Sequence, residues 1–285
     1  MCNNSLTLIM TSGSENMNID EFVDAEEIFF ELASQQRLSI IFDLYQKKSK
    51  LSDLSKDLRI TMQEVHRNVN RLQDAGLIEK DSEGIFSLTT FGNTIIKQIP
   101  SFDFLSRHKE YFSEHTLGEL PMKFVQRIGA LNNCELVRGI VAILEFWKQI
   151  YRESENYIFE IIPQVPLDLI EPILFNVRDR GIRLCYIFPS DVIIPKGRTE
   201  LLKRLRFDEL YDTGRIGRRM VDKVQVAVVI NEKKASVLFP TQKGETDMNL
   251  MFYSEDQLFH DWCLDYFWFR WYGSKSFEED KLREI

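Results

Sequence analysis

The sequence predicts an α+β winged helix-turn-helix in its N-terminal part, followed by an α/β domain. Between residues 51 and 88, two short amphipathic helix patterns flank a tight turn and precede a hairpin pattern. From residue 119 onward, apolar strand patterns alternate with helix patterns. With 285 residues, of which 44% are hydrophobic, the chain is long enough to bury two cores.

The net charge of the chain is -8 and its pI is about 5.2, which argues against a protein that coats nucleic acid by bulk attraction. Residues 34–100 differ, because they carry ten basic and eight acidic side chains. This small positive surplus predicts only modest phosphate affinity for one module. We therefore expect a homodimer that presents two recognition helices.

The four cysteines lie far apart and form no C-x-x-C pair, so we expect reduced, buried thiols, with a thiol sensor as the open alternative. The first residues lack both a basic segment and a long apolar core. No run approaches the roughly 18 apolar residues of a membrane span. The sequence predicts a cytoplasmic protein without a cofactor.

The chain begins with polar residues, and residues 1–19 are expected to be disordered. Residues 19–32 predict an acidic amphipathic helix whose aromatic side chains pack either on their own domain or in a dimer seam. Ser34 then has the position of an N-cap. It opens a helix whose predicted inward side chains are Leu38, Ile41, Phe42 and Tyr45.

The helix-turn-helix follows. Leu51, Leu54 and Leu58 recur at helical spacing, and a turn comes next at residues 59–60. Thr61 and Glu64 have the spacing of a capping box, in which hydroxyl and carboxylate each satisfy a free backbone amide. The pattern predicts a recognition helix over residues 61–75, ended by Gly76 in a left-handed conformation.

The recognition helix has one apolar and one polar side. Its predicted inner face is Ile60, Val65, Val69 and Leu72, which places Gln63, Arg67 and Asn70 outside, with Glu64, His66 and Arg71 on the flanks. Arginine can pair with guanine and Gln or Asn with adenine, whereas Arg71 suits a phosphate. The predicted DNA-binding residues are Thr61, Gln63, His66, Arg67, Asn70, Arg71 and Lys80.

Two short strand patterns, at residues 77–80 and 85–88, flank a glycine-bearing turn and predict a wing. Lys80 and its neighbours in this wing are expected to touch phosphate or the minor groove. Thr89 or Thr90 then caps another helix. Polar side chains of these types occur on the outer face of any solvated helix. The prediction of DNA binding therefore depends on the full order of capped helix, glycine, wing and following helix.

We predict five segments: a disordered terminus (1–19), the winged helix-turn-helix (20–100), a connector helix (101–118), the α/β domain (119–273) and a loose polar tail (274–285). His108 and His115 lie seven residues apart on or near the connector. They lack further ligands, so no metal site is expected and both are expected to be solvated or capping.

The second half predicts a strand at residues 134–137, a helix at 140–151 and a buried strand at 157–162. Pro166 opens a helix that ends at Gly181, and a strand follows at 182–188. Strand, helix and strand with these gaps imply parallel pairing. The remaining prediction is a basic helix at 198–205, strands at 218–221, 224–230, 235–239 and 250–253, and an aromatic helix capped by Ser254.

Two stretches resemble known families. The capped helix, D-A-G-L-I-E-K, the wing and L-T-T-F-G-N resemble the winged-helix domains of ArsR-type and related archaeal regulators. The stretch from residue 110 to 137 resembles the start of the regulatory domain in archaeal regulators related to the methanogenesis regulatory protein. The matching residues are Glu114, His115, Leu117, Leu120, Pro121, Arg127, Ile128, Gly129 and Leu131. Together the resemblance covers residues 34–272 and implies a phospholipase-D-like or TrmB-like regulatory domain that senses a signal.

These observations predict a sequence-specific DNA-binding transcription regulator that is not an enzyme. An adaptor that binds protein is the first alternative, and it predicts that Gln63, Arg67 and Asn70 are dispensable. A phosphodiesterase-like enzyme is the second, but no histidine has a lysine two residues on, as phospholipase-D chemistry requires. For an anionic effector, the guessed ligand residues are Arg215, Arg218, Arg219 and Lys243. The alternative is a solvated loop whose arginines pair with Glu209 or Asp212.

Overall fold

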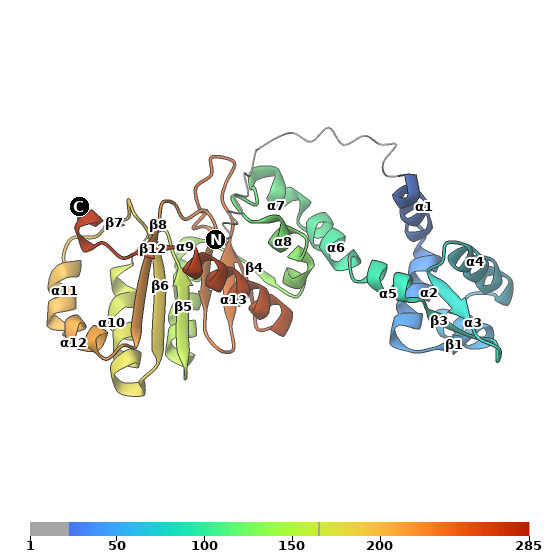
Figure 1. Cartoon of the computed structure of the whole chain (residues 1–285), viewed down its shortest axis with the longest axis horizontal. Helices are drawn as coiled ribbons and strands as arrows, with labels where there is room; N and C mark the ends of the chain where they lie inside the picture. Colours follow the sequence, from blue (N-terminus) through green and yellow to red (C-terminus); the bar gives the residue numbers. More distant parts are fainter. Residues whose placement is uncertain (1–22, 165, 285) are drawn as a thin grey trace, which may run out of the picture. The chain divides into compact units, whose positions relative to one another are not determined.

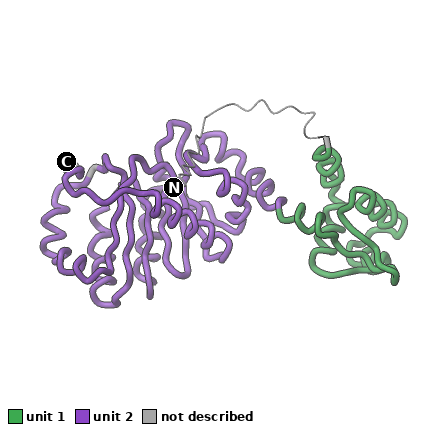
Figure 2. The backbone as a smooth tube through the Cα atoms, in the orientation of Figure 1, with its two compact units in different colours: residues 1–97 green, residues 98–285 purple. Residues whose placement is uncertain are grey.

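The computed structural model describes residues 23–164 and 166–284, and its contacts divide the chain into two units (Figures 1 and 2). Unit 1 is Met1–Lys97 and unit 2 is Gln98–Ile285. The disorder predicted for residues 1–19, and the first residues of the predicted acidic helix, lie outside the described residues.

Unit 1 is a winged helix-turn-helix, as its sequence predicts. The three strands pair antiparallel in the order β1-β3-β2, and helices α2, α3 and α4 pack on them. Apolar side chains of these elements form the core, among them Ile41, Leu54, Val69 and Phe86. The elements are α1 (Val23–Leu32), α2 (Gln35–Gln46), β1 (Ser49–Lys50), α3 (Leu51–Leu58), α4 (Met62–Asp74), β2 (Ile78–Lys80), β3 (Ile85–Leu88) and α5 (Thr90–Ile96).

The inward face predicted for α2 was wrong in part. Ser34 does cap this helix, but Phe42 and Tyr45 are 44% and 51% exposed. Ile41 is buried as predicted, and Ile40 and Leu44 are buried in place of Phe42 and Tyr45. Phe42 and Tyr45 each follow a buried residue by one position, and a step of about 100° per residue turns them off the buried stripe.

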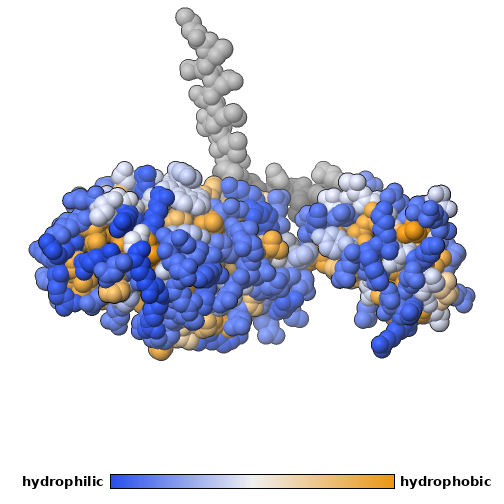
Figure 3. All heavy atoms as spheres, turned by 90° about the horizontal axis from the view of Figure 1, so that it is seen from below, coloured by the Kyte–Doolittle hydropathy of each residue, from blue (hydrophilic) through white to orange (hydrophobic). Residues whose placement is uncertain are grey.

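The face of the molecule in Figure 3 is mostly hydrophilic, with hydrophobic residues in separate spots.

Unit 2 is an α/β domain around one eight-stranded sheet, in the order β12-β8-β6-β5-β9-β10-β11-β4. Strands β5, β6 and β8 are parallel, and their neighbours on both sides are antiparallel. The strands are β4 (Glu135–Arg138), β5 (Tyr157–Ile161), β6 (Arg183–Pro189), β7 (Ile193–Ile194), β8 (Ile216–Val221), β9 (Ala227–Ile230), β10 (Ala235–Leu238), β11 (Leu250–Ser254), β12 (Lys275–Ser276) and β13 (Arg283–Glu284). The parallel pairing of β5 with β6 is the one that the sequence predicts.

Helices cover both faces of this sheet (Figure 1). Alternation along the strands decides what each face meets. Phe159 of β5 stacks on Phe267 of α13, whereas Glu160 of the same strand accepts a hydrogen bond from Tyr151 of α9. The α-helices of the unit are α6 (Ile99–Arg107), α7 (Lys109–Glu114), α8 (Met122–Val125), α9 (Ile140–Glu153), α10 (Leu167–Phe175), α11 (Arg198–Arg204), α12 (Phe207–Asp212) and α13 (Gln257–Tyr272). Two short 3-10 helices, η2 (Ile128–Leu131) and η4 (Glu279–Lys281), and one π-helix, η3 (Asn176–Arg180), complete it.

The predicted connector is two helices, α6 and α7, that belong to unit 2. Phe104 of α6 is fully buried and Tyr111 of α7 nearly so, both within the core of the α/β domain. His115 was expected to be solvated or capping. It stands at the C-cap of α7, but it is buried, stacks on Tyr111 and bonds Asp247 Oδ2 at 2.9 Å.

Two expectations near the C-terminal end were wrong. Asp256, not Ser254, caps α13, because its Oδ1 accepts hydrogen bonds from the amides of Leu258 and Phe259. The tail was expected to be loose, but β12 pairs antiparallel with β8, and Phe277 packs against the core. Among residues 23–164 and 166–284, no helix is both long and apolar enough to cross a membrane.

One carboxyl group lies inside unit 2. Glu160 points from the middle of β5 into the layer between the sheet and α9, where it is 4% exposed. Burial raises the pKa of Glu160 from its ordinary 4.5 to about 7, because the ionised carboxylate loses its hydration; the hydrogen bond from Tyr151 opposes that shift. The folded chain therefore holds a proton here that the unfolded chain has released between about pH 4.5 and 7.

We predict that the wild type loses stability in unit 2 as the pH rises and that Glu160→Gln does not, so the free energy of unfolding of the variant increases relative to that of the wild type. The wild type loses roughly 3 kcal/mol of unfolding free energy across this window, because its unfolded state binds fewer protons there; glutamine has no proton to lose. Urea unfolding followed by tryptophan fluorescence at pH 5 and pH 8 measures the effect, since all four tryptophans lie in unit 2. Glu171→Gln, on the exposed side of α10, is the control and should show no such trend.

Candidate nucleic-acid interface

The turn between α3 and α4 sets the direction of the predicted recognition helix. Arg59 ends α3 with a φ of 55°, in the left-handed region, and Ile60 leads into the cap. Thr61 Oγ1 accepts a hydrogen bond from the Glu64 amide at 3.2 Å, and Glu64 Oε2 accepts one from the Thr61 amide at 2.9 Å. This is the predicted capping box, and these hydrogen bonds lower the pKa of Glu64.

The inner side of α4 is held by apolar packing and by one buried amide. Val65, Val69 and Leu72 are buried at 1% exposure or less. Asn68 is also buried; its Nδ2 donates to Gln36 Oε1 of α2 and to the Glu64 carbonyl, both at 3.0 Å. These contacts leave α4 little freedom to roll about its axis, so its outer side has a defined direction.

The outer side of α4 carries the predicted base-reading residues. Gln63, His66, Arg67 and Asn70 are all exposed. Asn70 Nδ2 lies 3.4 Å from His66 Nδ1, so these two side chains are neighbours on the helix surface. Arg67 forms no ion pair with another described residue. The structure thus brings these four predicted side chains together on one solvent-facing side.

Arg71 differs from the rest of the predicted set because it contacts α1. Its Nε donates to Glu31 Oε2 at 3.0 Å and its second guanidinium nitrogen to Glu31 Oε1, while its guanidinium lies 5.1 Å from the centre of the Phe30 ring. Arg37 also pairs with Glu31, at 2.9 Å. The hydrogen bond from Arg71 lowers the pKa of Glu31. To contact a phosphate, Arg71 would have to share or leave this pair.

The wing is the β2–β3 hairpin, as predicted. Asp81 Oδ1 accepts from the amides of Glu83 and Ile85, both at 2.9 Å, and Gly84 has a φ of +80°. Lys80 is exposed, with its ammonium 5.5 Å from the centre of the Phe86 ring. The same hairpin carries three exposed acidic residues, Glu79, Asp81 and Glu83, against this single lysine, so the wing attracts phosphate only weakly.

Three exposed residues near the start of α4 were not in the predicted set. Met62, the first helical residue, is 49% exposed, and Lys56 and Arg59 are exposed on α3 and in the turn. Neither Lys56 nor Arg59 pairs with a carboxylate of the described residues. The sequence carried signals for two of these residues. Met62 lies four residues before His66 and so on the same side of the helix, and Arg59 lies in the turn that precedes it.

The four guessed effector residues do not form one cluster. Arg218 and Arg219 are successive on β8 and point to opposite faces: Arg218 lies over Tyr211 and Phe277, and Arg219 lies over Trp271 of α13. A period of two along a strand requires this separation. Lys243 lies in another loop, where its amide donates to Thr241 Oγ1. The predicted pairing of these arginines with Glu209 or Asp212 is also not seen; Arg218 pairs with Glu279.

No protein-family model matches the chain, and no curated protein matches it. Several solved structures are similar to it, three of which are described here by their coverage and identity. TrmBL2, described as an archaeal chromatin protein with a novel mode of DNA binding, is 16% identical over 91% of this chain and 100% of that chain, with a TM-score of 0.38. Reduced HlyU from Vibrio cholerae is 21% identical over 33% of this chain and 94% of its own, with a TM-score of 0.25.

The third is Nuc from Salmonella typhimurium, a phospholipase D family member, which is 11% identical over 52% of this chain and 99% of its own, with a TM-score of 0.35. All three TM-scores lie below 0.5. The resemblance to the methanogenesis regulatory protein family stays a prediction.

We predict that Glu31→Gln loosens α1 and the adjoining end of α4. The substitution removes one charge-assisted pair from each of two arginines, which costs about 1 to 3 kcal/mol at pH 7. Because the pKa of Glu31 is lowered in the folded chain, this stabilisation is present above pH 4.5 and is lost as the pH falls through the folded pKa. Hydrogen exchange of the α1 and α4 amides measures it.

Glu27→Gln, on the exposed side of the same helix, is the matched control for this change. It removes the same charge from α1 but no ion pair that the structure shows. Equal exchange in both variants would mean that net charge, and not the Glu31–Arg71 contact, stabilises this corner of unit 1.

Proposed function

We propose that the chain is a sequence-specific DNA-binding transcription regulator that inserts α4 into the major groove. The observation that carries the proposal is the exposed row of Gln63, Arg67 and Asn70 on a helix whose opposite side is rigidly held. An arginine can donate two hydrogen bonds to guanine, and Gln or Asn can exchange two with adenine. A helix fixed against rolling presents these donors in one register.

Cations next to the recognition helix support the proposal. Lys56 and Arg59 lie before α4, at the side where the helix dipole also favours an anion. Both are exposed and unpaired among the described residues, as phosphate contacts are before DNA arrives. Exposed Met62 offers an apolar contact beside them, suited to a thymine methyl group. Within the predicted set, Arg71 and Lys80 would contact DNA less directly. Arg71 is paired with Glu31, and Lys80 shares its hairpin with acidic residues.

The proposal includes a homodimer. Each unit 1 has few unpaired cations, so one module alone would bind phosphate weakly, and two modules on a two-fold axis would add their contacts. The exposed aromatic residues Phe30, Phe42 and Tyr45 supply apolar area in unit 1 that a second copy could cover.

The proposal also assigns a sensing role to unit 2, as a TrmB-like or phospholipase-D-like regulatory domain without catalysis. Three parallel strands with helices on both faces form the centre of unit 2, an arrangement that supports a ligand-binding domain. Its sequence lacks the H-x-K run of phospholipase-D chemistry, which supports a domain without catalysis. A signal bound there would change DNA affinity by about 5- to 150-fold, the usual range of coupling between two sites. An adaptor that binds protein remains the competing reading.

We predict that Arg67→Ala weakens binding to the preferred operator by about 1 to 3 kcal/mol and relaxes the choice of base at one position. Arg59→Ala should instead weaken all sequences alike and reduce the salt slope by roughly one ion, because it removes a phosphate contact. A salt titration on operator and scrambled DNA, after selection of preferred sequences from genomic fragments, measures both.

Arg204→Ala removes an exposed arginine of unit 2 and is the control. If Arg67→Ala leaves selectivity unchanged, α4 does not read bases. If the wild type selects no sequence at any salt concentration, the adaptor reading replaces this proposal.

We predict that the operator holds two half-sites about 10 base pairs apart, or a multiple of this, because a two-fold dimer presents its recognition helices one DNA turn apart. Sedimentation should give a mass twice the 33.6 kDa of the chain, and footprinting should give paired protections. If α2 takes part in the dimer, Phe42→Glu should return the sedimentation mass to that of one chain, because it places a charge in the apolar contact. A single protected half-site bound by a monomer would contradict this part of the proposal.

A further inference from the structure

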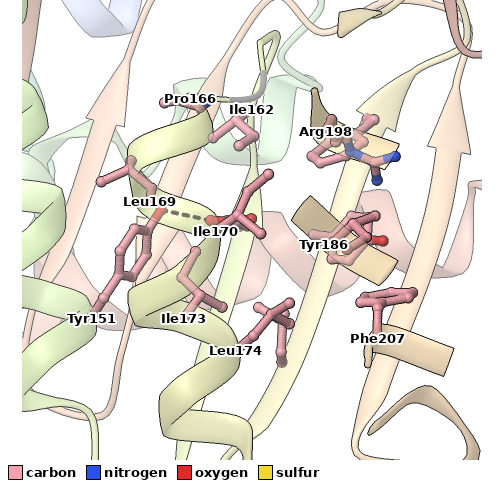
Figure 4. A pocket seen from close by; sticks show the side chains of 14 residues that line it. Tyr151, Ile162, Pro166, Leu169, Ile170, Ile173, Leu174, Tyr186, Arg198 and Phe207 are labelled. Carbon is pink, nitrogen blue, oxygen red and sulfur yellow. Dashed lines mark hydrogen bonds between the residues drawn. The ribbon is translucent and has the colours of Figure 1, made fainter. Parts of the chain in front are cut away.

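The cavity between the sheet and α10 is too small for an organic ligand. Tyr151, Ile170 and Tyr186 are among the side chains that line it (Figure 4), and its volume is about 50 Å³. This is about a third of the roughly 150 Å³ that holds benzene. Its lining is almost wholly apolar, so it is a packing gap in the core. A ligand of unit 2 therefore needs another site.

A groove of about 850 Å³ lies at the carboxyl end of the parallel strand β8. Its walls come from α8, from the C-terminal half of α13 and from residues 220–223. Open α/β sheets usually bind their ligands beyond the carboxyl ends of parallel strands. Sites for small organic molecules measure roughly 300 to 1,000 Å³. The groove thus has both the place and the size of a ligand site.

The charged side chains that line this groove leave a positive surplus of two, because five are basic and three are acidic. Each acidic side chain already has a basic partner. The pairs are Arg127–Asp265 at 2.8 Å, Arg270–Glu119 at 2.5 Å and Lys275–Asp222 at 2.6 Å. Lys123 and Lys223 remain; both are exposed, and neither pairs with a carboxylate of the described residues. The surplus consists of these two ammonium groups, which lysine carries at neutral pH.

Arg270 of α13 joins the segments that carry the two lysines. Its side chain is 14% exposed; it pairs with Glu119, just before α8, and it donates to the carbonyl oxygen of Lys223 at 3.1 Å. Lys123 of α8 is placed by an aromatic ring, since its ammonium lies 4.2 Å from the centre of the Phe269 ring. The groove is therefore formed before any ligand arrives.

Aromatic side chains at the end of α13 give the groove a flat apolar surface. Tyr272 stacks on Trp268, with ring centres 5.7 Å apart and 27° between the ring planes. Tyr272 is nevertheless 81% exposed, so most of its ring can receive a second planar group. Aromatic side chains stack on every nucleobase, because each base has a π-face.

We propose that this groove binds a purine nucleoside monophosphate. Its base would stack on Tyr272, and its phosphate would pair with Lys123 and Lys223. A phosphomonoester carries a charge of roughly -1.5 to -2 at pH 7, which matches the surplus of two. Phe269, beside Lys123, precedes Tyr272 by three residues, a rise of roughly 4.5 Å along the helix, which a nucleotide can span.

This inference names a ligand for the sensing role of unit 2, so its meaning for regulation rests on the proposed function. The binding itself does not, because every residue of the groove belongs to unit 2.

Isothermal titration calorimetry of the full chain without DNA tests the proposal, with AMP, adenosine and ribose 5-phosphate as probes. We expect AMP to bind at one site per chain. Adenosine lacks the phosphate and ribose 5-phosphate lacks the base, so each should bind at least about tenfold more weakly. A rise in NaCl from about 50 to about 500 mM should weaken the binding of AMP but not of adenosine, because salt screens exposed charges.

Variants separate the two halves of the site. Tyr272→Ala should weaken AMP binding roughly 5- to 100-fold, whereas Tyr272→Phe keeps the ring and should bind like the wild type. Lys123→Gln and Lys223→Gln together should weaken AMP binding roughly tenfold and remove its salt dependence. Lys203→Gln and Phe175→Ala, at exposed positions of α11 and α10 outside the groove, are the matched controls. Tryptophan fluorescence on urea unfolding establishes that each variant is folded.

Several outcomes would overturn the proposal. They are the absence of AMP binding to the wild type, equal binding of AMP and adenosine, equal binding of AMP and ribose 5-phosphate, and AMP binding that survives both Tyr272→Ala and the double lysine substitution. A chain that binds AMP in this way but selects no DNA sequence would keep this site and lose the proposed function. The reverse result would lose the site alone.

Discussion

The apolar stripe of α4 is the interaction on which unit 1 depends. A helix of thirteen residues is marginal alone in water, so burial of Val65, Val69 and Leu72 against α2 and the wing supplies most of what keeps it folded. The same burial decides which side chains face outward. Asn68 adds direction to this packing, because a buried amide must keep its partners on α2 and on the preceding turn. A loss of the stripe would therefore remove both the helix and the register of Gln63, Arg67 and Asn70.

In unit 2 the corresponding constraint is the alternation of side chains along parallel strands. Phe159 and Gly217 face α13, whose aromatic rings cover that side of the sheet. Glu160, Tyr186 and Arg218 must then face the other helices, although all three carry polar groups. The sheet has no way to expose them without exposing its apolar neighbours. Partners inside the layer satisfy part of this polarity: Tyr151 donates a hydrogen bond to Glu160, and Glu279 pairs with Arg218.

The two units treat their arginines differently, and the difference follows from burial. Arg67 stays in water, where an unpaired guanidinium costs little and remains available to a polyanion. Arg71 and Arg218 are drawn into ion pairs with Glu31 and Glu279. Arg198 is nearly inaccessible, and its ion pair at 3.4 Å leaves its Nε unsatisfied. Sequence alone does not separate these cases, because each is an arginine on an amphipathic element.

The sequence by itself determined the parts that local chemistry controls. The capping box at Thr61 and Glu64, the hairpin around Gly84, the cap at Ser34 and the crossover between β5 and β6 depend on residues close in the chain, and all were predicted. So was the solvent-facing side of α4, because a 3.6-residue period and three apolar positions settle it. The C-terminal tail and the connector were predicted less well, since their partners lie far away in the sequence. β12 forms only by pairing with β8, and Phe104 is buried only by packing into the core of the α/β domain.

Only the tertiary structure decided which charges are paired. Glu31 and Arg71 are separated by 40 residues, and Arg218 and Glu279 by 61. No local pattern announces such contacts, because they arise when separate elements pack. The same holds for the cavity, which takes its walls from α9, β5, α10, β6, α11 and α12 at once. The sequence determined each wall by its own periodicity, and the packing of the walls decided that a space remains between them with an arginine at its edge.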